Sequence, residues 1–388
     1  MAYYYKLGEI PPKRHTQFRQ PDQSLYKEEL VSSKGFSGIY SNLYHIHAPT
    51  RVRAIGDPVA YGPKVLPDYP LRQTHLKTAF LGLTGSDYLE GRRMLMVNTD
   101  VAIGVCNLPE GYQMDYYYKN GEADELLYVH DGQGHLYSQF GKLNISKGDY
   151  VVIPRTTIYR LEFSAAPIRL LVLESYGPIE TVKHYRNALG QLLEHSPYCE
   201  RDIHPPQSLV TEAEPGDYLV KIKKQGYLHL YHYGHSPLDL VGWDGFLYPY
   251  TFSIYDFEPI TGRIHQPPPV HQTFQAPNFV VCSFVPRLFD YHPLAIPAPY
   301  NHSNIDSDEV LFYAEGHFMS RRGIDRGSFT LHPGGLPHGP HPGTVEKSIG
   351  AKATEEYAVM IDTFRPLLLT EAALEFLDED YPMSWADA

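Results

Sequence analysis

The sequence has little cysteine and no long apolar segment. Its three cysteines, Cys106, Cys199 and Cys282, stand apart, without any Cys-x2-Cys pair. This excludes a disulfide framework and a thiolate zinc site, and it is typical of a protein of the reducing cytoplasm. The first residues lack the apolar run of a signal peptide. No stretch of about 18 apolar residues occurs, so we expect a cytoplasmic protein without a membrane span.

Positive charge is also scarce. The chain of 388 residues carries 33 Lys and Arg against 45 Asp and Glu, a net charge of −12. Because phosphate binding needs a basic surface, we expect no nucleic-acid partner. The sequence is rich instead in Tyr (32), Pro (33) and Gly (31). Short runs rich in Val, Ile and Tyr alternate with turn residues from Met94 to Phe163 and again from Trp243, which predicts an all-β protein.

Changes in composition and in hydrophobic periodicity divide the chain into four segments. Residues 1–93 are predicted to be an N-terminal arm with leading strands, and 94–179 a first β-barrel. Residues 180–240, with a weak helical period, are predicted to connect it to a second barrel at 241–388. The last segment includes TEAALEFLDEDY (370–381), where we expect a C-terminal helix. The proline-punctuated arm is expected to wrap against something else, such as a neighbouring subunit.

The two β-rich segments repeat one pattern. Asp124-Glu125 and Asp308-Glu309 both begin an apolar run, and a Gly stands seven residues after each Glu. In each copy a second Gly is then followed six residues later by Pro: Gly148 and Pro154 in the first, Gly327 and Pro333 in the second. Agreement in order and spacing across several positions indicates an internal duplication.

This pattern resembles the cupin superfamily, whose small jelly-roll barrels carry two short motifs. The resemblance implies an all-β, two-barrel (bicupin) architecture with a few short helices. The second copy has the motif residues His302, Glu309, Gly316, Gly327, Pro333, Gly335 and His338. In the first copy, Tyr118 and Tyr159 stand in place of the two histidines. We therefore expect a metal in the second barrel and none in the first.

Two imidazoles and one carboxylate form the facial triad that binds non-heme Fe(II) and leaves positions open. Asp308 and Glu309 are neighbours in a predicted strand, so only one of them faces the barrel interior. Glu309 is preferred because its spacing to Gly recurs in the first copy. His45 and His47 form a His-x-His pair, but no Glu-x6-Gly follows it. We expect these two to be structural, or at most near the mouth of a site, and His341 to lie outside the ligand set.

Longer segments resemble one family of cupins, the homogentisate 1,2-dioxygenases. The matching runs are GEIPPKRHTQFR near the N-terminus, VGWDGFLYPY (241–250), PYNHSN (299–304) and LHPGGLPHGP (331–340). The resemblance implies an Fe(II) enzyme of tyrosine and phenylalanine catabolism that converts homogentisate and O2 to maleylacetoacetate. It also implies a homo-oligomer, either a trimer or a hexamer.

The resemblance also implies roles for individual residues. His302, Glu309 and His338 match the iron ligands, and His265 matches the active-site base. His338, Asn304, His332 and Phe318 match positions that bind or lie near the substrate. His271, six residues after His265, is an alternative base.

One departure from the family leaves the substrate open. Phe318, after Gly316-His317, stands where the family has a tyrosine that contacts the substrate. A dioxygenase for gentisate or a substituted hydroquinone is therefore an alternative, because one lost polar contact can change selectivity strongly. A non-catalytic bicupin or a metal-dependent isomerase is another. An anionic substrate would need local cations, for which the candidates are Arg287, Arg321 and Arg322, although solvated surface arginines are more common.

Overall fold

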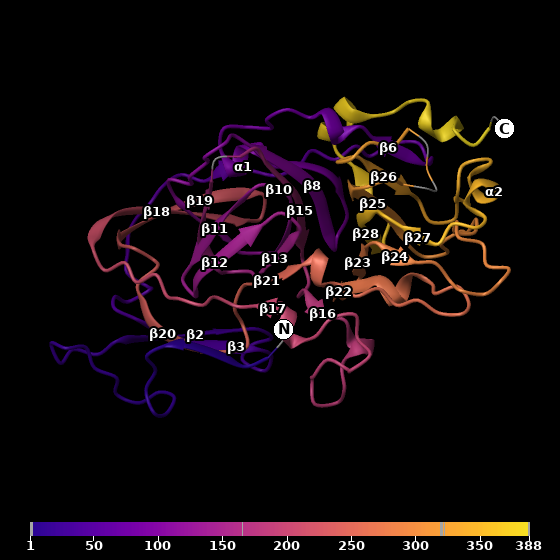
Figure 1. Cartoon of the computed structure of the whole chain (residues 1–388). Helices are drawn as coiled ribbons and strands as arrows, with labels where there is room; N and C mark the ends of the chain where they lie inside the picture. The colour runs from indigo at the N-terminus through magenta and orange to yellow at the C-terminus, as the bar shows by residue number, and fades with distance from the viewer. Residues whose placement is uncertain (1–2, 165, 319–320, 322, 387–388) are drawn as a thin grey trace.

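The computed structural model describes residues 3–164, 166–318, 321 and 323–386, and most of its regular structure is β (Figure 1). Two sheets form the first barrel. One sheet has the order β17 (Ile203–His204), β21 (Tyr250–Ser253), β13 (Asp149–Ile153), β10 (Asp124–Asp131), β15 (Ile168–Ser175), β8 (Val101–Leu108), β7 (Arg93–Val97) and β29 (Leu368–Leu369). The other has the order β12 (Gly141–Ser146), β11 (Gln133–Ser138), β14 (Ile158–Phe163), β9 (Tyr117–Asn120), β18 (Pro215–Lys224), β19 (Tyr227–His235) and β4 (Val52–Ile55), with β5 (Val59–Ala60) beside β19.

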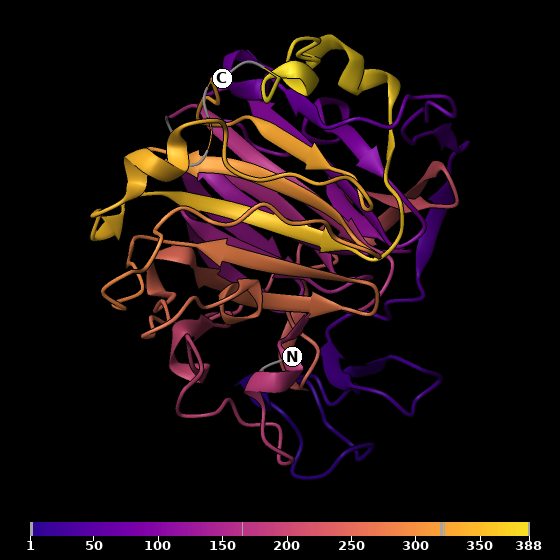
Figure 2. The same ribbon diagram turned by 90° about the vertical axis from the view of Figure 1, so that its right-hand side faces the viewer.

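The second barrel has one large wall and one small wall (Figure 2). The large wall is a sheet of β16 (Glu180–Thr181), β22 (Gln272–Ala276), β23 (Phe279–Phe284), β28 (Tyr357–Thr363), β25 (Asp308–Glu315), β26 (Phe329–His332) and β6 (Thr74–Leu76). The small wall is the pair β24 (Arg287–Leu288) and β27 (Ala353–Thr354), with long loops beside it. The all-β, two-barrel architecture predicted from the repeat is confirmed.

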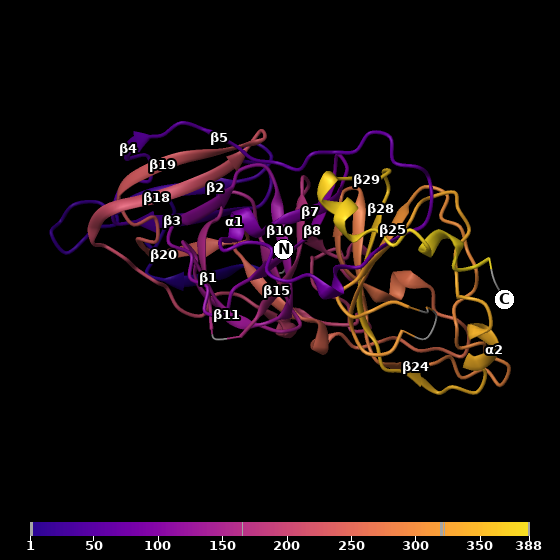
Figure 3. The same cartoon turned by 90° about the horizontal axis from the view of Figure 1, so that it is seen from above.

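The barrels lie side by side (Figure 3). They also share a core of buried side chains. One continuous cluster of buried apolar side chains includes residues of β10, β13 and β15 on one side and of β22, β23, β25 and β28 on the other. The rings of Tyr128 and Phe312 meet edge to face at 6.2 Å, and those of Tyr150 and Phe274 at 5.5 Å. The barrels also exchange strands, since β6 pairs with β26 while β21 and β29 pair with strands of the first barrel.

The interiors of the two barrels differ. The first is filled by a large buried cluster that includes Tyr118, Tyr159 and Leu161. The second contains a small cluster of Val280, Cys282 and Met360, with a cavity of about 390 Å³ beside it. Close-packed side chains fill the interior of the first barrel, whereas the cavity in the second barrel lies beside the predicted metal ligands His302 and Glu309.

The N-terminal segment folds onto its own chain. Its strands β1 (Tyr5–Gly8), β3 (Tyr40–His45) and β2 (Lys27–Ser32) form a sheet with β20 (Leu240–Gly245). In β20, Trp243 is fully buried, and its Nε1 donates a hydrogen bond of 2.8 Å to the carbonyl of Phe140. The predicted arm thus contacts the rest of the same chain.

The segments with predicted helices are mostly not α-helical. Residues 180–240 contain the long hairpin β18–β19, and the weak helical period at the start of this segment gives the 3₁₀ turn η2 (Lys183–Tyr185). Near the C-terminus, the structure has the 3₁₀ segments η6 (Glu371–Phe376) and η7 (Tyr381–Met383). Thr370 does not cap η6, because its hydroxyl donates to the carbonyl of Met94 at 2.6 Å. A contact with β7 thus takes the place of the predicted helix cap.

The remaining helical elements are short. They are α1 (Tyr88–Gly91), α2 (Thr344–Ser348), η1 (Thr78–Phe80), η3 (Glu200–Asp202), η4 (Ile254–Asp256) and η5 (Pro268–His271). Within the described ranges, no helix is long and apolar enough to cross a membrane.

Candidate metal centre and its cavity

Strand β25 turns Glu309 toward the second barrel's cavity and holds Asp308 away from it. The two Asp308 oxygens accept backbone N–H groups, Oδ1 from Gly334 and Oδ2 from Leu367, both at 2.7 Å. Asp124 also accepts two backbone N–H groups in the first barrel. Successive side chains of a strand point to opposite faces, so Glu309 is the acid that lines the cavity.

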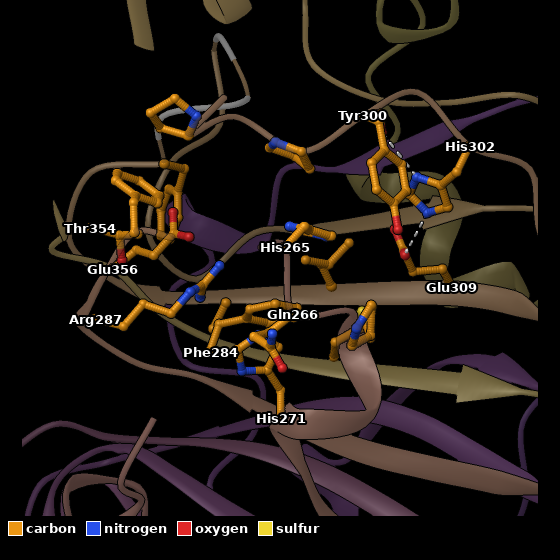
Figure 4. A pocket seen from close by; sticks show the side chains of 18 of the residues that line it. His265, Gln266, His271, Phe284, Arg287, Tyr300, His302, Glu309, Thr354 and Glu356 are labelled. Atoms are coloured by element: carbon orange, nitrogen blue, oxygen red, sulfur yellow. Dashed lines mark hydrogen bonds and ion pairs between the residues drawn. The ribbon is translucent and has the colours of Figure 1, made fainter. Parts of the chain in front are cut away.

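The backbone brings His302 and His338 together beside Glu309. The two histidines exchange backbone hydrogen bonds of 2.8 and 2.9 Å. His302 Nε2 lies 3.6 Å from Glu309 Oε2, and His338 Nε2 lies 3.4 Å from Glu309 Oε1. One ligand atom from each of the three residues lies within 4.8 Å of the others. Figure 4 shows His302 and Glu309 at one end of the cavity.

The hydrogen bonds of the two rings favour a metal at this point. His302 Nδ1 lies 3.3 Å from the carbonyl of Tyr300, and His338 Nδ1 lies 3.2 Å from that of Leu336. A carbonyl oxygen only accepts, so each Nδ1 donates, and in a neutral ring each Nε2 keeps its lone pair. Both lone pairs then face the Glu309 carboxylate, and the buried His338 Nε2 has no hydrogen-bond partner. Three acceptors that converge in this way fit a bound cation.

The titration of these groups reflects the same geometry. Burial opposes ionisation of Glu309, but the nearby rings of His302, His332 and His338 hold the pKa of its carboxyl well below the usual range. The contact with Glu309 raises the pKa of His302, although burial opposes it.

His332 fixes the orientation of the Glu309 carboxylate by a hydrogen bond. Its Nδ1 donates to Glu309 Oε1 at 2.8 Å, and its Nε2 accepts from the Tyr381 hydroxyl at 3.2 Å. The side chain is fully buried, and burial lowers the pKa of His332 to about 4, so the ring is neutral at pH 7. The sequence placed His332 near the substrate, whereas the structure places it outside the cavity lining, where it orients a predicted ligand.

The first barrel has a cation of its own at the equivalent position. Glu125 accepts from Tyr159 at 2.7 Å and from Arg92 Nη1 at 2.6 Å, and Arg92 Nη2 contacts Glu174 at 2.9 Å. Tyr118 and Tyr159 face each other across β9 and β14, as His302 and His338 do in the second barrel. The guanidinium thus neutralises the retained glutamate. Sequence reasoning missed Arg92, because nothing around it marks a contact with Glu125.

The cavity lies between the large sheet and the β24–β27 pair, and the candidate base residues line it. His265 is 41% exposed, and its Nδ1 lies 3.5 Å from Asp290 Oδ2. His271 is buried, its ring packs 4.7 Å from that of Phe284, and burial lowers its pKa to about 3. Figure 4 shows His265 between Arg287 and Glu309. The choice between the two histidines stays a prediction.

The structure also places the other predicted substrate residues. Asn304 and Phe318 line the cavity, and the Phe318 ring packs 4.6 Å from that of Tyr313. His338 is completely buried between His302 and His332 and lies outside the cavity lining.

Two further titratable residues lie near Glu309: Asp362, which the sequence motifs did not single out, and Arg321, which was a candidate cation for an anionic substrate. Asp362 is the cross-strand partner of Glu309, and its Oδ1 is buried without a hydrogen-bond partner. Burial and the charge of Glu309 raise the pKa of Asp362 to about 8. Arg321 donates to the carbonyl of Gly339 and also lines the cavity, whereas Arg322 lies outside the described residues. An acid at the end of the apolar run AVMI was the one sequence signal for Asp362.

A second group of potential metal ligands lies elsewhere, at His47, His235 and Asp239. The Asp239 oxygens already accept from His45 Nδ1 and from the backbone N–H of His47, both at 2.7 Å. The rings of His47 and His235 are stacked at 4.6 Å. These contacts connect the end of β3 to the loop before β20, which is a structural role of the kind expected for His45 and His47.

The fold and the site together define a two-barrel cupin protein with a two-histidine, one-glutamate candidate metal centre in its second barrel. A family model described as homogentisate 1,2-dioxygenase N-terminal matches residues 70–254. Over 387 residues the chain is 43% identical to a Saccharolobus solfataricus protein provisionally named a dioxygenase, and the match covers 99% of each chain. A homogentisate 1,2-dioxygenase of Sinorhizobium fredii is 26% identical over 323 residues, which cover 77% of this chain and 70% of that one.

Among solved structures, a cupin barrel protein of Leptotrichia buccalis matches 81% of this chain and 98% of its own, with a TM-score of 0.32 and 10% identity. The chain belongs to the homogentisate 1,2-dioxygenase family of the cupin superfamily. It is an oxidoreductase of the ring-cleaving dioxygenase class.

Proposed function

We propose that the protein is an Fe(II)-dependent dioxygenase that converts homogentisate and O2 to maleylacetoacetate in the catabolism of tyrosine and phenylalanine. The observation that carries this proposal is the convergence of His302, Glu309 and His338 at the end of a cavity in the second barrel. This donor set is the one that non-heme iron oxygenases use. Relatives that carry the name homogentisate 1,2-dioxygenase support the choice of substrate.

His302, Glu309 and His338 would hold the iron, which when bound supplies the activation of O2 and the transfer of electrons from the ring. The chain's own residues bind and orient the substrate. Apolar side chains of the cavity wall, Phe284, Leu311, Phe318 and Met360, contact the ring and exclude water.

His265 is the proposed base for a ring hydroxyl. Its Nδ1 faces the Asp290 carboxylate at 3.5 Å, which favours a proton on Nδ1. Nε2 is then available to accept the proton of the hydroxyl, as a general base does near neutral pH. His271 is the alternative base, although its burial disfavours the protonated form that results.

A dioxygenase acting on gentisate or a substituted hydroquinone is the second candidate. Phe318 favours it, because a phenyl ring offers no hydrogen bond to a substrate hydroxyl at that part of the cavity wall.

We also propose that the protein forms a homo-oligomer, a trimer or a hexamer, with a small aromatic acid and O2 as its other partners. Apolar side chains on loops of the second barrel are largely exposed in the single chain, for example Ile264 (68%), Leu294 (84%) and Ile305 (94%). Exposed apolar surface of this kind is common at subunit contacts. Light scattering of the purified protein measures the assembly directly.

The proposal is tested by loading the protein with Fe(II) without oxygen, adding homogentisate and then O2, and following oxygen uptake and ultraviolet absorption by the product. Glu309→Gln is expected to lose bound iron and activity. Glu315→Gln is the matched control, because Glu315 ends the same strand in a partly exposed ion pair with Lys147. Oxygen uptake with gentisate or a hydroquinone, but not with homogentisate, would mean that homogentisate is not the substrate. No oxygen uptake with any of these compounds would refute the proposed function.

A further inference from the structure

Several buried polar atoms that line the cavity have no hydrogen-bond partner among the described residues. They are His271 Nδ1, Arg287 Nη1, Arg321 Nε, Thr354 Oγ1 and Asp362 Oδ1. Unpaired buried polar atoms are rare in folded proteins, because each costs desolvation energy. Their concentration around one cavity indicates a ligand that supplies the missing partners.

Four of these atoms, all except His271 Nδ1, fall into two groups. Asp362 and Arg321 lie near the candidate metal centre, since Asp362 is the cross-strand partner of Glu309 and Arg321 donates to the carbonyl of Gly339, the residue after His338. Figure 4 shows Arg287 and Thr354 on the other side of the cavity, with His265 between them and the metal ligands. The second group is therefore separate from the metal centre.

Arg287 and Thr354 lie next to each other on two paired strands. They are cross-strand partners in the short β24–β27 pair, which places their backbones side by side. Both line the cavity, and each has a buried polar atom without a partner. A guanidinium and a hydroxyl side by side offer several donors to one ligand group.

The side chain of Arg287 lines the cavity and packs against the Phe284 ring. Within the described part of the chain, its guanidinium takes part in no hydrogen bond or ion pair, and its Cζ lies 5.7 Å from the centre of the Phe284 ring. Two acids that also line the cavity, Glu356 and Asp290, act on Arg287 through their charges. Asp290 instead lies 3.5 Å from His265.

We infer that Arg287 and Thr354 form a subsite that binds the carboxylate of the aromatic substrate, at the end of the cavity away from the metal centre. This inference rests on the proposed function, because it assumes that the ring occupies the same cavity. It defines the substrate class as an aromatic acid whose carboxylate lies beyond the ring as seen from the metal centre.

The chemistry of the two residues matches this ligand. The planar guanidinium donates two parallel hydrogen bonds to a carboxylate, and bonds between charged partners are stronger than neutral ones. The protein as a whole carries a charge of −12 and repels anions. A half-buried arginine at the end of the cavity therefore provides the local attraction that an acidic substrate needs.

The test compares two ligands that share a ring but differ in charge. Homogentisate and the uncharged methylhydroquinone are titrated by calorimetry into Fe(II)-loaded full-length protein without oxygen. Arg287→Gln is expected to weaken homogentisate binding by roughly 10- to 100-fold, and Thr354→Val by a smaller factor. Neither is expected to change binding of methylhydroquinone by more than about twofold. The control is Arg201→Gln, because Arg201 is exposed on η3 and lies outside the cavity lining.

Equal loss for both ligands, or no loss for the acid, would overturn the inference. Arg287→Lys keeps the charge without the planar fork and is expected to give an intermediate loss for the acid alone. If Arg287→Gln does not fold, selective loss in the Lys and Thr354→Val variants decides in its place.

A third ligand separates this inference from the proposed function. Phenylacetate has the carboxylate but no ring hydroxyl, so its binding depends on the subsite and not on ring cleavage. Phenylacetate binding that depends on Arg287, without oxygen uptake on any hydroxylated ring, would keep the subsite and refute the proposed function. Cleavage of homogentisate with an unchanged KM in Arg287→Gln would refute the subsite and keep the function.

Discussion

Replacing His332 with leucine is expected to weaken metal binding although His332 is not a predicted ligand. The His332 ring is fully buried and donates a hydrogen bond of 2.8 Å to Glu309 Oε1. Leucine leaves that oxygen unpaired and lets the carboxylate rotate. Loss of such an outer hydrogen bond lowers metal affinity by about 10- to 100-fold. Loss of a hydrogen bond to a charged group costs about 1.5–3 kcal/mol, which corresponds to a similar range.

The affinity is measured by competition with a chelator under anaerobic conditions, using Fe(II) or Co(II) at pH 7. His332→Gln keeps an amide donor and is expected to retain more affinity than His332→Leu. The control is His195→Gln, because His195 is exposed on a loop far along the chain from the site. Thermal unfolding of the metal-free proteins shows whether each variant folds. If folded His332→Leu binds metal within twofold of the wild type, Glu309 is not oriented by His332.

Three further predictions concern other buried groups. Burial alone would lower the pKa of His45, but hydrogen bonds to Asp239 and Glu29 raise that pKa from 6.5 to about 9. The contribution of His45 to stability is therefore complete below about pH 6.5 and is lost as the pH rises through about 9. His45→Gln is expected to lower the free energy of unfolding, measured by urea titration, by about 3 kcal/mol at pH 6 and by much less at pH 9.5. Arg92→Met leaves the buried Glu125 carboxylate without its cation, whereas Glu174 keeps its ion pair with Lys223 at 2.6 Å, and it is expected to cost about 3–5 kcal/mol in the same assay. Phe318→Tyr adds a hydroxyl to the cavity wall and is expected to lower the KM for homogentisate about threefold to tenfold in oxygen-uptake assays.

Each of these predictions has its own control. His15→Gln removes a histidine that is 95% exposed, so its effect on unfolding is expected to be small at both pH values. The control for Arg92→Met is Arg93→Met. The Nη1 of Arg93 donates to the backbone carbonyl of Glu90 and not to a buried carboxylate, so little loss of stability is expected. Equal losses at pH 6 and 9.5 in His45→Gln, or equal losses in the two arginine variants, would contradict the reasoning. An unchanged KM in Phe318→Tyr would show that the substrate does not reach this wall.

The repeat was readable from the sequence because its residues act locally. Gly132 and Gly316 both have positive φ angles, +106° and +98°, a conformation that other residues rarely adopt. Such a turn requires glycine wherever it occurs, so the Glu-x6-Gly spacing appears twice in the sequence. Strand alternation separated Asp308 from Glu309 for the same local reason.

The sequence by itself thus determined the two-barrel class, the candidate ligands and the loss of histidines in the first barrel. The tertiary structure alone decided which groups meet across the chain. Arg92 neutralises Glu125, His332 orients Glu309, and Arg287 lies beside Thr354 in the cavity wall. These contacts join residues distant in sequence, and they depend on the path of the chain between them. No local spacing or periodicity encodes that path, so only the folded structure shows where these charges and donors come together.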